Sequence, residues 1–184
     1  MARTPSNMLP LGTALPEVLL PDGAGDSYPL RDSVKNNGLL VMFICNHCPF
    51  VLHIADYLPT LARELSALEI GTVAISSNDA VQHPEDGPDK MVAFAAHHNF
   101  PFPYLYDEAQ TVAQAFDAAC TPDFFLFDGN LNLAYRGQID AARPGNDTPV
   151  NGVDVLAAAR ALAAQEKVSD RQVPSLGCGI KWKL

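Results

Sequence analysis

The chain has 184 residues, of which 48% are hydrophobic and 18% charged, and this is typical of one compact soluble domain with a real core. A formal net charge of −9 argues against nucleic acid or an anionic membrane as the main partner. No apolar run approaches the ~20 residues of a membrane span, and prolines interrupt the N-terminal segment. We therefore expect a cytoplasmic protein with no membrane partner and no signal peptide.

The first half of the chain alternates strand and helix signals. Two short apolar segments surround a turn-rich stretch, and two longer apolar runs predict buried strands. Between these runs, apolar residues recur at helical spacing from 51 to 68, which predicts one long helix that Pro59 should kink. The expected elements are strands 17–20, 28–30, 39–44 and 71–76 and a helix over 49–68.

The second half of the chain continues the alternation after a polar loop over 77–88. An Asp128-Gly129-Asn130-Leu131 turn predicts a hairpin, because Asp-Gly and Gly-Asn tolerate positive φ. Asp107 is a candidate N-cap for the helix that follows it. The expected elements are helices 90–98, 108–119 and 153–167 and strands 104–106, 124–127 and 132–136.

This order of elements predicts an α/β fold in which a central mixed sheet carries helices on both faces. The β-α-β start requires a parallel pairing, and the closing hairpin adds antiparallel strands. We expect residues 1–184 to form a single domain with its core at about 12–167 and a C-terminal tail, 168–184, docked on it.

Two cysteines stand at the junction between the strand over 39–44 and the helix that follows it. They form the run Cys45-Asn46-His47-Cys48. We expect Cys45 to lie exposed at the positive end of the helix and Cys48 to lie one turn further in. This spacing favours reversible dithiol/disulfide chemistry.

Four stretches of the chain resemble a known family. Combined with the cysteine pair, a Thr-Pro step some 75 residues later makes the likeness specific. The chain is similar to peroxiredoxin-like proteins of the thioredoxin fold (the alkyl hydroperoxide reductase/thiol-specific antioxidant, or redoxin, group) that carry a thioredoxin-type Cys-x-x-Cys. The resemblance covers roughly residues 10 to 184 and implies a three-layer α/β/α sandwich. The matching stretches are 41–51, 101–108, 120–128 and 174–183.

The cysteine pair predicts a thiol–disulfide oxidoreductase without a bound cofactor. Cys45 is the expected nucleophile, because a helix N-terminus stabilises a thiolate. It would attack a protein or small-molecule disulfide, and Cys48 would then attack Cys45 to release the product, with a thiol reductant closing the cycle. A protonated His47 between the two cysteines would stabilise the thiolate further, although a solvated surface role for His47 is equally open.

Peroxide reduction is the first alternative function. In true peroxiredoxins the reactive cysteine ends a Pro-x-x-x-Thr-x-x-Cys motif. In this register Cys48 takes the cysteine position, but Cys45 replaces the threonine and Val41 the proline. The resemblance to the motif therefore favours disulfide exchange over peroxide reduction.

Thr121 and Pro122 are the second element of the predicted site. The resemblance implies that the bond between them is cis and that it faces the cysteine pair. Thr121 would then offer its backbone to an extended substrate segment, as an added β-strand does. Pro122 would also shield the thiols from a metal ion.

The other two cysteines, Cys120 and Cys178, are candidate additional redox thiols. Cys120 precedes the Thr-Pro step, and Cys178 lies between two glycines in the tail. A buried structural role is open for both residues. A non-enzymatic module that holds zinc through four cysteines is a further alternative, but such sites usually show two close pairs and this chain has one. We predict no metal and either a monomer or a homodimer.

Overall fold

The computed structural model describes residues 3–184. Its central sheet has five strands in the order β6-β5-β4-β8-β9, with β4, β5 and β6 parallel and β8 and β9 antiparallel to their neighbours. All residues of β4 and β5 are buried, as expected of strands covered on both faces. The strands span Gly38–Phe43 (β4), Ile70–Ser76 (β5), Tyr104–Tyr106 (β6), Asp123–Phe127 (β8) and Leu133–Gly137 (β9).

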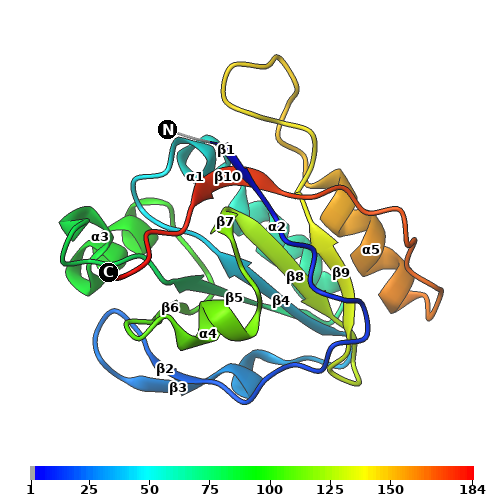
Figure 1. The fold of residues 1–184 in the computed structure, drawn as a ribbon. Helices are drawn as coiled ribbons and strands as arrows, with labels where there is room; N and C mark the ends of the chain where they lie inside the picture. The colour runs from blue at the N-terminus through cyan, green and yellow to red at the C-terminus, as the bar shows by residue number, and fades with distance from the viewer. Residues whose placement is uncertain (1–2) are drawn as a thin grey trace.

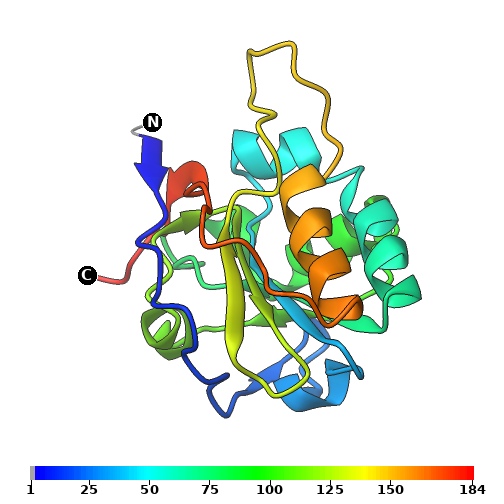
Figure 2. The ribbon, with the colours of Figure 1, turned by 90° about the vertical axis from the view of Figure 1, so that its right-hand side faces the viewer.

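Helices cover both faces of the central sheet (Figures 1 and 2). The larger layer contains α1, α2, α3 and α5, and the opposite face carries α4 and the N-terminal segments. These helices span Pro49–Ile54 (α1), Leu58–Ala67 (α2), Pro88–His97 (α3), Thr111–Ala115 (α4) and Val153–Ala163 (α5), with 3₁₀ turns at Leu30–Ser33 and Pro84–Asp86.

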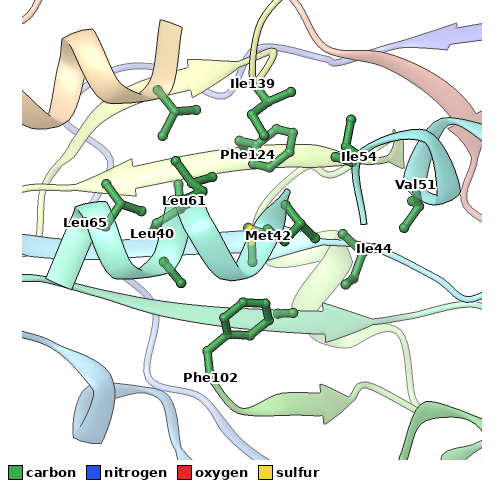
Figure 3. Close-up of a cluster of buried hydrophobic side chains, with 14 of the residues drawn as sticks. Leu40, Met42, Ile44, Val51, Ile54, Leu61, Leu65, Phe102, Phe124 and Ile139 are labelled. Atoms are coloured by element: carbon green, nitrogen blue, oxygen red, sulfur yellow. The ribbon is translucent and has the colours of Figure 1, made fainter. Parts of the chain in front are cut away.

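Alternation along β4 divides the hydrophobic core into two parts. Leu40 and Met42 pack beneath α2 and α5, as Figure 3 shows, whereas Val41 and Phe43 face the α4 side. The two parts together bury the sheet and fix the position of its carboxyl edge, where β4 ends and the cysteine pair begins.

The single kinked helix expected over 49–68 is wrong, because the chain forms two helices separated at residues 55–57. Pro59 is the second residue of α2 rather than an interior kink. Its missing N–H costs nothing there, because the first N–H groups of a helix have no intrahelical partner. The break lets α1 turn away from α2 over the end of the sheet.

The helix expected over 108–119 is shorter than predicted, and its N-cap is Gln110 rather than Asp107. Asp107 is buried, and its carboxylate accepts hydrogen bonds from Ser77 Oγ and from the Ala113 backbone N–H, both at 2.9 Å. It therefore ties the start of α4 to the end of β5 from a position three residues before the N-cap.

Two small sheets flank the central one. β2 (Leu19–Pro21) pairs with β3 (Ser27–Pro29). The other sheet has the order β1-β10-β7, and it joins both ends of the chain to the middle (Figure 1). β1 spans Arg3–Pro5, β7 spans Cys120–Thr121 and β10 spans Leu176–Gly179. Among the described residues, no helix is long and apolar enough to cross a membrane.

Candidate active site: a cluster of buried thiols

The cysteine pair lies at the carboxyl edge of the sheet, where β4 passes into α1. Cys45 follows β4 by two residues, and Cys48 is the N-cap of α1, with Pro49 as the first helical residue. Cys45 is 1% exposed and Cys48 is fully buried. The expectation of an exposed Cys45 is therefore wrong, because neighbouring segments cover the pair.

The Thr121-Pro122 peptide bond is cis, as predicted. Thr121 contacts both thiols of the pair. Its hydroxyl lies 3.4 Å from Cys45 Sγ, and its carbonyl oxygen accepts a hydrogen bond from the Cys48 thiol at 3.2 Å. The structure therefore brings Cys45, Cys48 and Thr121 together from segments that are more than 70 residues apart in the chain.

A third thiol reaches the pair from the C-terminal tail. Cys178, on β10, places its Sγ 2.8 Å from Cys48 Sγ, within hydrogen-bond distance. Cys120, one residue before Thr121, instead directs its thiol to the Pro122 carbonyl oxygen at 3.7 Å. No disulfide joins any of the four cysteines, all of which lie in the described part of the chain.

The electrostatic environment favours a thiolate at Cys48. A hydrogen bond from Cys45 is the largest cause that lowers the pKa of Cys48, to about 5, and the Cys178 thiol and the Val51 backbone N–H lower it further against the cost of burial. The pKa of Cys45 is raised instead, by its hydrogen bond to Cys48, by burial and by the charge of Asp86. These directions favour Cys48 over Cys45 as the thiolate, and the expected role of Cys45 as the nucleophile stays a prediction.

His47 lies closest to a carboxylate, and one of its ring nitrogens also lies within 4.8 Å of Cys45 Sγ. Its Nδ1 lies 2.7 Å from Asp86 Oδ2, and its ring stacks on His83 with the centroids 5.3 Å apart. Asp86 is fully buried and accepts hydrogen bonds from the Asn46 backbone N–H and from Asn78 Nδ2, each at 2.8 Å. His47 thereby fixes the loop between the two cysteines against the segment 84–86.

Residues 11–136 of the chain match the AhpC/TSA family. The chain belongs to this family. Its crystallised relatives include an uncharacterized conserved protein from Geobacillus kaustophilus, with 48% identity, coverage of 100% of this chain and 97% of that one, and a TM-score of 0.96. A hypothetical protein from Sinorhizobium meliloti 1021 shares 44% identity over 98% of both chains, with a TM-score of 0.95.

More distant structures share the fold alone. Peroxidoxin BcpB from Mycobacterium tuberculosis is 20% identical to this chain, with a TM-score of 0.63. The match covers 84% of this chain and 96% of that one. The fold of this AhpC/TSA protein is thus thioredoxin-like, as predicted. A comparison with curated proteins found no match. Family membership supports a redox function carried by thiols.

Two groups of side chains in this AhpC/TSA protein present donor atoms close enough to share a metal ion. They are Cys45, His47 and Asp86, and His47, His83 and Glu85, with the donor atoms of each group within 4.8 Å of one another. Both carboxylate oxygens of Asp86 already accept hydrogen bonds from Asn46 and Asn78. The buried Asp86 carboxylate is therefore hydrogen-bonded within the protein itself.

Neither Asp86 nor Tyr104 is predicted from the sequence to be a site residue. Asp86 lies in the stretch 77–88, which is expected to be a polar loop, but its side chain is buried beside the pair. Tyr104 donates to Asn46 Oδ1 at 3.0 Å, and burial raises its pKa well above the usual value, with the charges of Cys45 and Asp86 adding to the effect. Asp86 belongs to no motif, whereas Tyr104 lies in the stretch 101–108 that carries the family resemblance, which is a signal that could have found it.

A buried carboxyl next to the Thr-Pro step predicts that stability depends on pH. Burial raises the pKa of Asp123 to about 7, although Ser6 Oγ donates to Oδ1 at 2.5 Å. The folded protein therefore holds the proton more tightly than the unfolded chain does. The proton on Asp123 contributes up to about 4 kcal/mol to the free energy of unfolding. This contribution is fully present below about pH 4 and is lost as the pH rises through 7. Urea unfolding between pH 4 and 8 should show this decline.

Asp123→Asn is the matched variant, because it keeps an acceptor for Ser6 but cannot titrate. We expect its free energy of unfolding to change much less with pH than that of the wild type. Equal pH dependence in the two proteins would show that Asp123 titrates normally.

Proposed function

We propose that this protein is a thiol–disulfide oxidoreductase that works through the Cys45/Cys48 dithiol. The observation that carries the proposal is the environment of Cys48. It is the N-cap of α1, its Sγ lies 2.8 Å from Cys178 Sγ and 3.2 Å from the Thr121 carbonyl oxygen, and its hydrogen bond with Cys45 is the largest cause that lowers its pKa, to about 5. A thiolate at neutral pH is the form that attacks a disulfide. The substrate is a disulfide of a protein or a small molecule, and a thiol reductant restores the dithiol.

The chemistry follows from the positions of the two thiols. The Cys48 thiolate attacks one sulfur of the substrate disulfide, the substrate S–S bond breaks, and the first product leaves as a thiolate. Cys45 then attacks Cys48 of the mixed disulfide, and the second product leaves while a Cys45–Cys48 disulfide forms. The two product thiolates take up the protons that the enzyme thiols release. Both electrons come from the dithiol, and two thiols of the reductant return them.

Thr121 supports both steps in this proposal. Its hydroxyl, 3.4 Å from Cys45 Sγ, also lowers the pKa of Cys45, and its carbonyl oxygen accepts from Cys48 only while that residue is a thiol. The Thr121 hydroxyl therefore favours the ionised form of Cys45, and the Thr121 carbonyl oxygen contacts the protonated form of Cys48. Pro122 follows it through the cis peptide bond at the end of β7.

Catalysis of disulfide reduction tests the proposal. With glutathione disulfide as substrate and dithiothreitol as electron donor, the full chain should accelerate the reaction, and prior alkylation of its thiols should remove the acceleration. Cys120→Ser should keep the activity, because Cys120 directs its thiol to the Pro122 carbonyl oxygen. A wild-type rate equal to that of buffer alone would refute the oxidoreductase proposal.

Peroxide reduction is a second candidate, favoured by one observation. Cys48, which takes the position of the peroxiredoxin cysteine, is the residue with the lowered pKa, and the Thr121 hydroxyl contributes to lowering it. Hydrogen peroxide should then produce sulfenic acid at Cys48 alone, faster than at any other cysteine. Sulfenic acid formation that is slow or spread over several cysteines would exclude this candidate.

A further inference from the structure

The C-terminal strand lies where the resemblance places an extended substrate. β10 pairs antiparallel with β7, and Cys178 stands opposite Thr121 in the register. Thr121 is the residue expected to offer its backbone to a substrate segment, so the chain's own tail occupies that position. The thiol that the tail presents there is Cys178, with its Sγ 2.8 Å from Cys48 Sγ.

The strand that carries Cys178 is built for this close approach. On its outer side β10 pairs with β1, where Cys178 stands opposite Arg3. A Cβ at Gly177 would lie 2.0 Å from the Thr121 carbonyl oxygen, so only glycine lets β10 come this near to β7. Cys178 is 3% exposed, and it is therefore held at Cys48 rather than displayed to solvent.

We propose that Cys178 is a second resolving thiol for Cys48, which forms a Cys48–Cys178 disulfide that ties the C-terminal strand to the start of α1. The inference rests on the proposed function, because it begins from a mixed disulfide between Cys48 and a substrate thiol. The Cys178 thiolate attacks Cys48 Sγ, the new S–S bond forms, and the bond to the substrate breaks. The substrate leaves as a thiolate and takes up the proton that Cys178 releases, so the substrate disulfide is the oxidant of the whole sequence.

Local charge lets Cys178 compete with Cys45 for this second step. Burial and the neighbouring Cys48 raise the pKa of Cys178 to about 12, while Lys181 on the same segment lowers it. The contribution of the Cys48 charge to the pKa of both thiols disappears once Cys48 is in a mixed disulfide. Burial still opposes ionisation of both, but Asp86 adds to this effect at Cys45, whereas Lys181 acts against it at Cys178.

The experiment removes Cys45 and asks whether Cys48 is still resolved. Reduced Cys45→Ser is treated with glutathione disulfide, and its disulfides are mapped by mass spectrometry of peptides from the full chain. We expect an intrachain Cys48–Cys178 disulfide and little bound glutathione. In Cys45→Ser/Cys178→Ser the reaction should stop at glutathione on Cys48, with at least about tenfold more mixed disulfide than in Cys45→Ser.

The outcomes separate this inference from the function on which it rests. A stable mixed disulfide between glutathione and Cys48 in the Cys45→Ser variant would overturn the role of Cys178. It would leave the oxidoreductase proposal intact. Absence of glutathione from Cys48 of the double variant would instead refute Cys48 as the attacking thiol, and both proposals with it. Cys45→Ser/Cys120→Ser is the matched control and should form the Cys48–Cys178 disulfide as Cys45→Ser does.

Discussion

Cys48→Ser should lower the rate at which the reduced protein attacks a disulfide by about tenfold at pH 7. Cys48 has a pKa of about 5 and is almost fully ionised at this pH, whereas burial still raises the pKa of Cys178 after the effect of Cys48 on it is removed. The greater intrinsic nucleophilicity of a more basic thiolate recovers part of the difference but not all of it. Stopped-flow reaction with an aromatic disulfide measures the rate.

Two controls make the Cys48→Ser result specific. Cys120→Ser should react like the wild type, because burial raises the pKa of Cys120 and keeps it unreactive. Cys45→Ala should react more slowly than the wild type below pH 7, because loss of the hydrogen bond from Cys45 raises the pKa of Cys48. A Cys48→Ser protein that reacts as fast as the wild type would move the attacking thiolate to another cysteine.

Gly177→Ala should expose the thiols of Cys45 and Cys48 to reagents in solution. Its Cβ would lie 2.0 Å from the Thr121 carbonyl oxygen, and a backbone atom cannot move aside as the end of a side chain can. Such overpacking costs about 1–3 kcal/mol. We expect β10 to separate from β7 while the hydrophobic core keeps its packing. Alkylation of Cys45 and Cys48 by iodoacetamide should therefore accelerate by about tenfold or more, since each 1.4 kcal/mol is about a factor of ten.

Gly179→Ala is the matched control in the same strand. Its Cβ would meet the Thr4 hydroxyl at 3.1 Å, and this side-chain group can rotate away. We expect its alkylation rate to stay within about twofold of that of the wild type, because surface adjustments of this kind cost little. Equal acceleration in both variants would show that any change in β10 opens the site, and no acceleration in Gly177→Ala would show that the strand does not cover it.

The central sheet and the position of the pair could be predicted from the sequence because their signals are local. Continuous apolar runs marked β4 and β5, and the cysteines directly followed the first of them. The Thr121-Pro122 step was found through its resemblance to a family motif. Helix bounds were less accurate, as the break between α1 and α2 shows, because an apolar stripe at helical spacing continues across a turn.

The rest of the site depends on contacts between distant segments. β1, β7 and β10 have two to four residues each, and β1 and β10 contain proline or glycine, so no alternating pattern marks them as strands. Only their mutual pairing places Cys178 at Cys48 and buries Cys45. In the same way, Asp86 is a lone acidic residue in a polar loop until the fold sets it against His47 and Asn46. From these contacts we propose that Cys48 attacks and Cys45 resolves, the reverse of the roles expected from the sequence.

If Cys48 carries the attacking thiolate, the rate at which the reduced protein first forms a mixed disulfide with glutathione disulfide tests this most directly. The wild type and Cys48→Ser should be measured side by side at pH 7, at equal concentration of the folded full chain. We expect rapid attack by the wild type and its loss in Cys48→Ser. Attack by Cys48→Ser as fast as by the wild type would contradict this assignment.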